Sequence, residues 1–401
     1  MDEAKERSPV QISTAELERR WTAVRRQMED RGIDVLVMQN TNQWLGGYVK
    51  WFTDIPAANG YPMTVMFERD AEMTVINCGP HMSEQSRLTD LSARDWSMRG
   101  VANRWTAPFF PSLYYSATYD AQLIAKYLSK RGKMTLGWVG PAHIHGVFQD
   151  YLRNNLANVT FVDATDMVDC IKAIKSPEEI ELIRIAAAVQ DKGFEAVLNN
   201  LKPGKRDNEV MAAAQYCLEL NGSEEQLIMV GSTPMGQPAS MYKRHFMHRV
   251  IQKGDQFTVM LEANGPGGFY TELARNCVLG KASSEQQEAF AIAKEAQAET
   301  LKLLKPGAVP GDIVAAHNEF LRRHGYPEER RLFAHGQGYD LVERPSIRED
   351  EPMHIQANMN ITVHPIVATK NVFTWVCDNY MITETGVSEC LHRTEKKIFE
   401  L

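Results

Sequence analysis

Two glutamates, Glu262 and Glu272, lie on either side of a Gly/Pro-rich turn at residues 265–268. The flanking segments alternate apolar residues, which predicts a β-hairpin that brings the two carboxylates face to face. Burying two acids together costs free energy unless a cation or a shared proton compensates. The pair therefore indicates either two solvated acids or a site that holds a cation or a shared proton.

Three further side chains of metal-binding type follow in the sequence. His335 lies in the segment Ala-His-Gly-Gln-Gly, whose glycines let the backbone approach closely, His364 ends an alternating apolar segment, and Asp378 lies in another. Taken singly, such a histidine is more often a core or surface residue, and such an aspartate a charge at a strand edge. Together with the glutamates they form a set of imidazoles and carboxylates that is typical of a divalent metal site.

Composition restricts the class of protein. The chain has 401 residues, 44% of them hydrophobic, and a formal net charge of −7, so we expect a globular protein with two domains and no electrostatic preference for nucleic acid or anionic membranes. The apolar segments are too short to span a membrane, and the first residues lack the apolar core of a signal peptide. Six cysteines are scattered without metal-binding spacing. We therefore expect reduced thiols and a cytoplasmic location.

Alternating strand and helix patterns fill the first part of the chain. A capping box at residues 13–16 predicts a helix that ends at Gly32. Buried strands are predicted at 33–40, 63–67, 73–79, 133–140 and 159–165, with a helix at 121–130. This order predicts an α/β domain over residues 1–169.

A second domain is predicted over residues 170–401. It starts with Ser176, Pro177 and Glu179, which have the spacing of an N-cap, a first helical residue and a capping box. The tetrapeptide Leu-Lys-Pro-Gly occurs at 201–204 and again at 304–307, each time between two helical segments and before apolar strands. Two copies of one unit predict a pseudo-twofold arrangement with a site between the halves.

From the helix at residue 176 onward, the sequence resembles the creatinase/aminopeptidase P/prolidase superfamily, whose catalytic domain has the α+β pita-bread fold. The first part resembles the N-terminal domain of the same proteins. The motifs that carry the resemblance are the Lys-Pro-Gly turns, Lys253-Gly254-Asp255, residues 268–272 with Arg275, residues 335–338 with Glu343 and Pro345, His364-Pro365 and Asp378. The resemblance implies an α/β fold with a pita-bread catalytic domain.

The resemblance also implies a metal site, but with altered ligands. In the peptidases of this superfamily, Asp, Asp, His, Glu and Glu hold two divalent ions. Here the corresponding residues are Glu262, for which Met260 and Leu261 are alternatives in register, then Glu272, His335, His364 and Asp378. The formal ligand charge falls from −4 to −3, so we expect one ion, Fe, Zn, Mn or Ni. A metal-free site is the alternative.

The same resemblance suggests catalytic residues and an activity. We expect His335, Glu343 and His245 to be catalytic, with His248 as the alternative to His245. The main prediction is a small-molecule hydrolase that cleaves a non-peptide C–N bond, amide or amidine-like, with a metal-activated water. The alternatives are an Xaa-Pro peptidase, a metal-dependent lyase resembling dimethylsulfoniopropionate lyase, and a catalytically dead binding module. Creatinase-like relatives dimerise, so we expect a homodimer.

Overall fold

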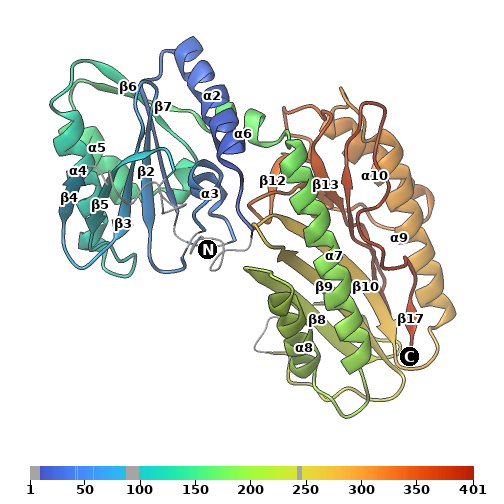
Figure 1. The fold of residues 1–401 in the computed structure, drawn as a ribbon. Coiled ribbons are helices and arrows are strands. Elements are labelled where there is room, and N and C mark those ends of the chain that lie inside the picture. Colours follow the sequence, from blue (N-terminus) through green and yellow to red (C-terminus); the bar gives the residue numbers. More distant parts are fainter. Residues whose placement is uncertain (1–9, 41, 43, 57, 87–98, 242–245) are drawn as a thin grey trace. The chain divides into compact units, whose positions relative to one another are not determined.

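The computed structural model describes residues 10–40, 42, 44–56, 58–86, 99–241 and 246–401 (Figure 1). The chain divides into two compact units, Met1–Lys172 and Ala173–Leu401. Each unit has its own hydrophobic core.

The first unit contains a seven-stranded mixed sheet with the strand order β4-β5-β3-β2-β1-β6-β7. The strands are β1 (Val35–Asn40), β2 (Met63–Glu68), β3 (Met73–Cys78), β4 (Ser83–Ser86), β5 (Val101–Ala107), β6 (Met134–Trp138) and β7 (Val159–Asp163). The helices are α2 (Thr14–Arg31), α3 (Gly47–Thr53), α4 (Tyr119–Leu128), α5 (Gly146–Asn155) and α6 (Thr165–Lys172), with short 3-10 helices η2 (Tyr114–Thr118) and η3 (Pro141–His143).

Local sequence signals explain where α2 begins and ends. The Ser13 hydroxyl accepts a hydrogen bond from the Glu16 amide, and Gly32 ends the helix with a left-handed φ of 63°. The five strands predicted for this unit and the helix α4 are confirmed. Strands β4 and β5 were not predicted, because β5 mixes polar and apolar residues and most of its residues are only half-buried.

The second unit repeats one arrangement twice: two helices followed by a sheet. The first copy consists of α7 (Pro177–Asn200), α8 (Asp207–Leu220), β8 (Gln226–Pro234), β9 (Asp255–Asn264) and β10 (Tyr270–Val278). The second consists of α9 (Ser284–Leu303), α10 (Pro310–Arg323), β11 (Ala334–Gly336), β12 (Glu343–Ser346), β13 (Asn360–Val363) and β16 (Asp378–Met381). The remaining strands are β14 (Ile366–Ala368), β15 (Phe373–Trp375) and β17 (Phe399–Glu400).

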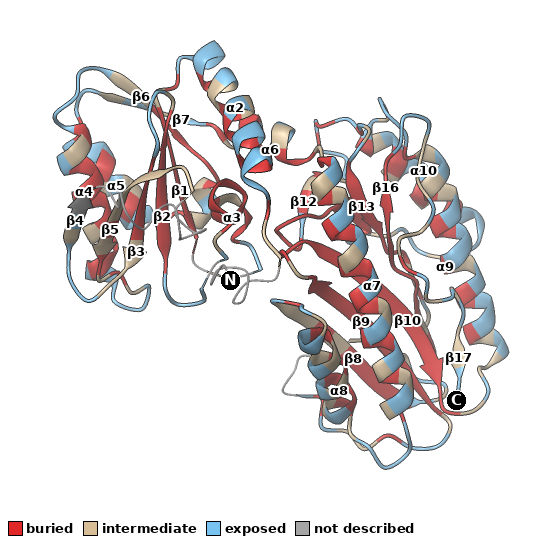
Figure 2. Ribbon diagram, in the orientation of Figure 1, coloured by how far each residue is buried: buried red, intermediate tan, exposed pale blue. Residues whose placement is uncertain are grey.

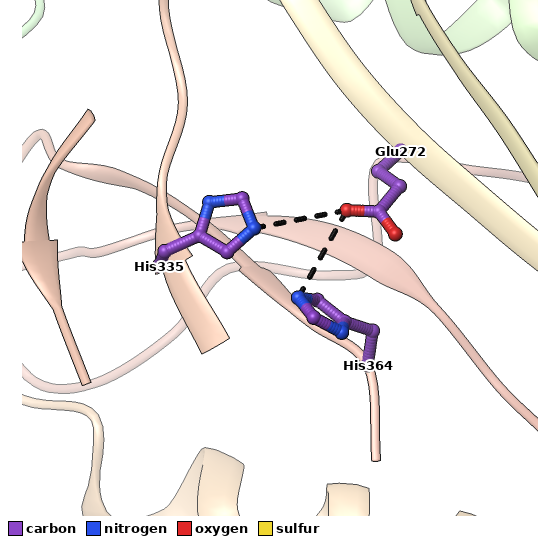
Figure 3. A group of neighbouring side chains, drawn as sticks. All are labelled: Glu272, His335 and His364. Carbon is purple, nitrogen blue, oxygen red and sulfur yellow. Dashed lines mark ion pairs between the residues drawn. The ribbon is translucent and has the colours of Figure 1, made fainter. Parts of the chain in front are cut away.

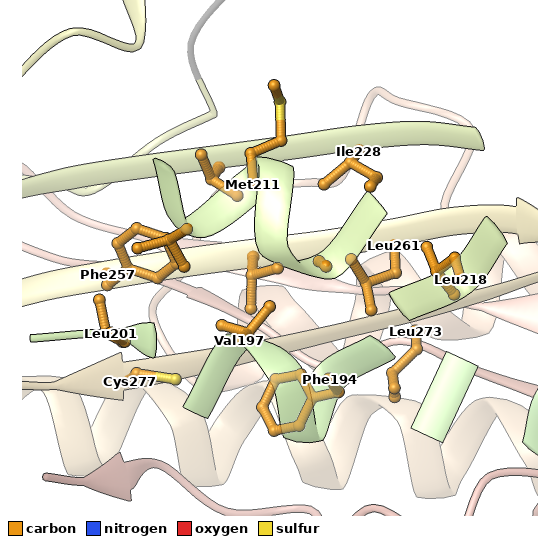
Figure 4. Packing of buried hydrophobic residues seen from close by; sticks show 14 of the residues in the cluster. Phe194, Val197, Leu201, Met211, Leu218, Ile228, Phe257, Leu261, Leu273 and Cys277 are labelled. Atoms are coloured by element: carbon orange, nitrogen blue, oxygen red, sulfur yellow. The ribbon is translucent and has the colours of Figure 1, made fainter. Parts of the chain in front are cut away.

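The predicted capping box starts α7. The Ser176 hydroxyl accepts from the Glu179 amide, the Glu179 carboxylate accepts from the Ser176 amide, and Pro177 occupies the first turn. Helices α7 and α8 then pack on the hairpin of β9 and β10, where alternate residues such as Phe257, Leu261 and Leu273 enter the core (Figure 4).

The hairpin is buried along its whole length, including its polar residues (Figure 2). Because successive strand residues point to opposite faces, one face of the hairpin fills the core under α7 and α8. The opposite face carries Met260, Glu262, Glu272 and Ala274. The alternation of apolar and polar residues therefore marks an internal polar face here, not a solvent-exposed one.

Candidate metal centre

The two hairpin glutamates face each other. Strands β9 and β10 pair antiparallel with Glu272 directly opposite Glu262, and directly opposed residues of a β-ladder project from the same face. Both glutamates are buried, with 7% of Glu262 and 3% of Glu272 exposed. The structure thus places two acids side by side inside the second unit.

One of these acids meets two histidines from the second repeat. A single carboxylate oxygen, Glu272 Oε2, lies 3.9 Å from His335 Nε2 and 4.0 Å from His364 Nε2 (Figure 3). His335 lies on β11, and His364 directly follows β13, its neighbour in the sheet. The three ligand atoms all lie within 4.8 Å of one another, so they converge on one point.

The hydrogen bonds of the two imidazoles show which nitrogens are left for a ligand at this point. His335 Nδ1 lies 2.9 Å from the Gly336 carbonyl oxygen. Since a carbonyl only accepts, Nδ1 carries the proton and Nε2 keeps its lone pair. Both ring nitrogens of His364 are buried and have no hydrogen-bond partner in the described structure. An unpartnered buried nitrogen is costly unless something binds it.

Burial controls the charges in this group. It raises the pKa of Glu272 to about 7, although the Cys377 thiol and Arg331 oppose the shift. It lowers the pKa of His335 to about 4. The pKa of His364 is lowered well below its ordinary value, first by burial and then by the charges of His335 and Arg331. At neutral pH both imidazoles are therefore neutral ligands.

This donor set fits a divalent cation. A cation would use the lone pairs of the unpartnered His364 nitrogen and of His335, and it would compensate the buried Glu272 carboxylate. Two histidines and one glutamate are the protein ligands of several catalytic zinc sites, and two histidines with one carboxylate also suit Fe(II). The group can thus hold a metal ion.

Glu262 is held apart from this group by an amide. Its Oε1 accepts a hydrogen bond of 2.9 Å from Gln337 Nε2. Burial, and then the charge of Glu272, raises the pKa of Glu262 well above its ordinary value, while the Gln337 hydrogen bond opposes the shift. Glu262 does not belong to the Glu272–His335–His364 group.

The structure does not bring Asp378 into the group either. Arg275 Nη2 lies 2.6 Å from Asp378 Oδ1, and both side chains are fully buried. Asp378 also lies near His392 and Cys390, with which it forms a second group of ligand-type side chains. The charge of Asp378 is thus already compensated by a guanidinium.

Two of the other predicted catalytic residues, Glu343 and His248, are described, and neither belongs to the Glu272–His335–His364 group. Glu343 makes a buried ion pair of 2.7 Å with Lys175. His245 lies outside the described residues, and the alternative, His248, is exposed. Its carbonyl oxygen accepts from Arg206.

Sequence reasoning missed Cys377. Its Sγ lies 3.3 Å from the Glu272 carbonyl oxygen and 3.2 Å from Thr362 Oγ1. It also belongs to a small apolar cluster with Met260, Ala274 and Trp375. Strand alternation could have predicted this contact, because Asp378 and Cys377 are adjacent and only one of them can face Glu272.

Known proteins with similar sequences or folds place this chain in a family. Residues 181–387 match the sequence model of Metallopeptidase family M24. The chain belongs to this family. It is a C–N bond hydrolase with the metallopeptidase-type fold, and the predicted superfamily is confirmed.

Two sequence relatives and two solved structures illustrate the similarity. An Xaa-Pro dipeptidase of Pyrococcus furiosus is 26% identical over 66% of this chain and 75% of that protein. The Xaa-Pro dipeptidase of Lactobacillus helveticus is 22% identical over 66% of this chain and 72% of that protein.

Dipeptidase PepE from Mycobacterium ulcerans superposes with a TM-score of 0.77 at 20% identity, covering 97% of this chain and 99% of that chain. X-Pro aminopeptidase from Thermotoga maritima gives 0.76 at 18% identity, covering 95% of this chain and 99% of that chain. The predicted fold class, with its α/β first domain and pita-bread second domain, is confirmed.

These relatives overturn the main functional prediction. Cleavage of a non-peptide amide or amidine bond was inferred from the altered ligands, but the named sequence relatives are peptidases. The inference was wrong because a changed ligand set alters the charge and number of ions a site can hold, whereas a set of two histidines and a glutamate is itself competent for peptide hydrolysis.

Among the described residues, no helix has the length and apolar content needed to span a bilayer.

Proposed function

We propose that this chain is a metal-dependent dipeptidase that cleaves Xaa-Pro dipeptides. The observation that carries the proposal is the convergence of Glu272, His335 and His364 in a chain of the M24 family. The named Xaa-Pro dipeptidases among its relatives support the substrate class.

Each of the three residues has a role in the proposal. Glu272, His335 and His364 hold one divalent ion, Fe, Zn, Mn or Ni, which when bound would polarise the scissile carbonyl and acidify a water molecule. The Gly336 carbonyl keeps the proton on His335 Nδ1, so that Nε2 stays a ligand. Burial of the group excludes bulk water and strengthens its electrostatic interactions.

A buried apolar cluster beside the acids supports the choice of proline. Met260 and Ala274 lie on the same hairpin face as Glu262 and Glu272, and they cluster with Trp375 and Cys377. An aromatic ring with small and flexible apolar neighbours suits a pyrrolidine ring, which has no N–H to satisfy.

Hydrolysis of Ala-Pro by purified protein tests the function. The protein would be stripped with a chelator and reloaded with Fe(II), Zn, Mn or Ni under anaerobic conditions, and release of proline would be measured. We expect turnover with at least one ion, and less with Ala-Ala. No turnover of any Xaa-Pro dipeptide with all four ions would overturn the proposal.

The proposal includes one ion per chain, a homodimer and a cytoplasmic location. The three-residue donor set supports one ion, and six cysteines that form no disulfide in the described structure fit a reducing compartment. Metal analysis and sedimentation equilibrium would test the first two statements. Two ions per chain, or a monomer at micromolar concentration, would contradict them.

A further inference from the structure

The hairpin face that carries the two glutamates continues past them to Tyr270. Tyr270 lies two residues before Glu272 on β10 and therefore projects from the same face. Its side chain is 1% exposed, and its hydroxyl has no hydrogen-bond partner in the described structure. A buried phenol hydroxyl usually has a partner, so this one is available to a ligand.

The orientation of Gln337 follows from a backbone group. The Glu272 amide donates to Asn379 Oδ1 at 2.8 Å, which turns Asn379 Nδ2 toward Gln337 Oε1, also at 2.8 Å. Gln337 must then direct its Nε2 toward Glu262. The Leu341 carbonyl, 3.0 Å from the same nitrogen, requires the same orientation.

This arrangement leaves one oxygen of Glu262 for another partner. Gln337 donates to Oε1, whereas no hydrogen bond is made to Oε2 by any residue that the structure describes. An amide N–H that donates to a carboxylate favours its ionised form. Burial and the charge of Glu272 oppose this ionisation, so a cation at the second oxygen would stabilise the charged carboxylate.

The electrostatic surroundings of Tyr270 are acidic. Burial, followed by the charges of Glu225, Asp340, Glu262 and Glu224, raises the pKa of the Tyr270 phenol. These acidic groups come from three separate segments of the chain, so they give this end of the face a negative potential. A negative potential beside a buried hydroxyl and a carboxylate favours a cationic hydrogen-bond donor.

We propose that Glu262 and Tyr270 form a subsite for the protonated amino group of the substrate. The inference rests on the proposed dipeptidase function and specifies it, since a dipeptide has a free ammonium group close to the bond that is cleaved. An ammonium needs hydrogen-bond acceptors, and the Glu262 carboxylate and the Tyr270 oxygen, on the same face of the hairpin, are two.

A second metal ion is the competing occupant of this position. A metal ion requires several ligand atoms around one point. In the part of the chain that the structure describes, Glu262 belongs to neither group of three ligand-type side chains. The geometry therefore favours the ammonium.

The subsite can be tested by binding, without turnover. Alaninamide, which has a free ammonium, and N-acetylalaninamide, which does not, would be titrated calorimetrically into the metal-loaded protein. We expect alaninamide to bind at least about 10-fold more tightly than the acetylated compound, because a hydrogen bond to a charged group changes affinity by about this factor. Equal affinities would overturn the subsite.

Two variants test whether Glu262 and Tyr270 cause the difference in affinity. Glu262→Gln and Tyr270→Phe should each weaken alaninamide binding about 10-fold and leave the bound metal unchanged, while Tyr216→Phe, an exposed tyrosine on α8, should change neither. Because the Tyr270 hydroxyl has no partner, Tyr270→Phe should not lower the melting temperature. Loss of metal in Glu262→Gln, or unchanged binding in both variants, would overturn the proposal.

The outcomes separate this inference from the proposed function. Alaninamide binding that depends on Glu262, without any hydrolysis of Xaa-Pro dipeptides, would support the subsite and remove the dipeptidase assignment. Hydrolysis of Ala-Pro together with equal affinity for the two amides would support the dipeptidase and remove the subsite.

Discussion

Two groups of similar side chains in the second unit have different electrostatic environments. Glu272, His335 and His364 form one group, and Asp378, Cys390 and His392 form the other. In the described structure, no lysine or arginine makes an ion pair with Glu272, whereas Asp378 is paired with Arg275 and lies 3.5 Å from Lys396. Burial thus raises the pKa of Glu272. Burial acts in the same direction on Asp378, but Arg275, His392 and Lys396 together outweigh it and hold that pKa low.

The difference shows that ligand-type residues alone do not define a metal site. A carboxylate that is already neutralised by a buried guanidinium gains little from a cation, and a cation there would be repelled by the arginine. A carboxylate beside two neutral imidazoles has no such competitor. The comparison supports the proposed metal site in the first group and a stabilising role for the second.

Removing a ligand of the first group should have the largest effect. Glu272→Gln or His364→Ala should lower metal affinity by about 100-fold or more, because each deletes one of three ligands, and even loss of a supporting contact costs 10–100-fold. Metal content after dialysis and Ala-Pro hydrolysis would both be measured. Full metal content in these variants would contradict the assignment.

Asp378→Asn should instead weaken the fold. The change leaves Arg275 buried without its counter-charge, which costs about 3–5 kcal/mol in the free energy of unfolding. Chemical denaturation would measure the loss, and metal content per folded chain should stay unchanged. Replacement of both partners, as in Arg275→Met with Asp378→Leu, should be less destabilising than Asp378→Asn alone. If Asp378→Asn lost its bound metal without losing stability, the second group and not the first would be the metal site.

The two groups should also respond differently to pH. Metal binding requires ionised Glu272, whose pKa is raised to about 7, so the apparent affinity should fall about tenfold per unit as the pH drops below 7. In the metal-free protein, the same raised pKa contributes stability that decreases as the pH rises from 4.5 to about 7. The low pKa of Asp378 contributes stability above its ordinary value of 3.8, lost only in stronger acid.

Competition with a chelator at several pH values would measure the affinity. An affinity that does not change between pH 5 and pH 7 would contradict the role of Glu272, given its raised pKa.

Cys390→Ser should have the smallest effect. The thiol lies in the second group, where Arg275 and Lys396 already compensate Asp378, so metal content should not change and stability should shift by less than about 1 kcal/mol. The same measurements as for Asp378→Asn apply. A loss of bound metal would show that the second group also binds an ion.

Local sequence patterns were enough to predict several helix and strand positions and the place of the hairpin. The capping residues Ser13 and Ser176 start helices where predicted, and the turn at 265–268 sets a register in which Glu262 faces Glu272. These features depend on neighbours a few residues away, so local patterns were sufficient to predict them. The repeated Lys-Pro-Gly turns likewise indicated two related halves.

Which acids share a point with the histidines depends on contacts between segments far apart in the sequence. Asp378 and Cys377 are adjacent, but Asp378 pairs with Arg275, 103 residues away in the sequence, whereas the Cys377 thiol contacts the Glu272 carbonyl oxygen. These partners depend on which strand β16 joins. The separation of Glu262 from the histidines likewise depends on Gln337 and Asn379, whose amides are oriented by contacts between β10 and β16. Charge compensation acts through space, and the sequence order does not reveal which side chains meet.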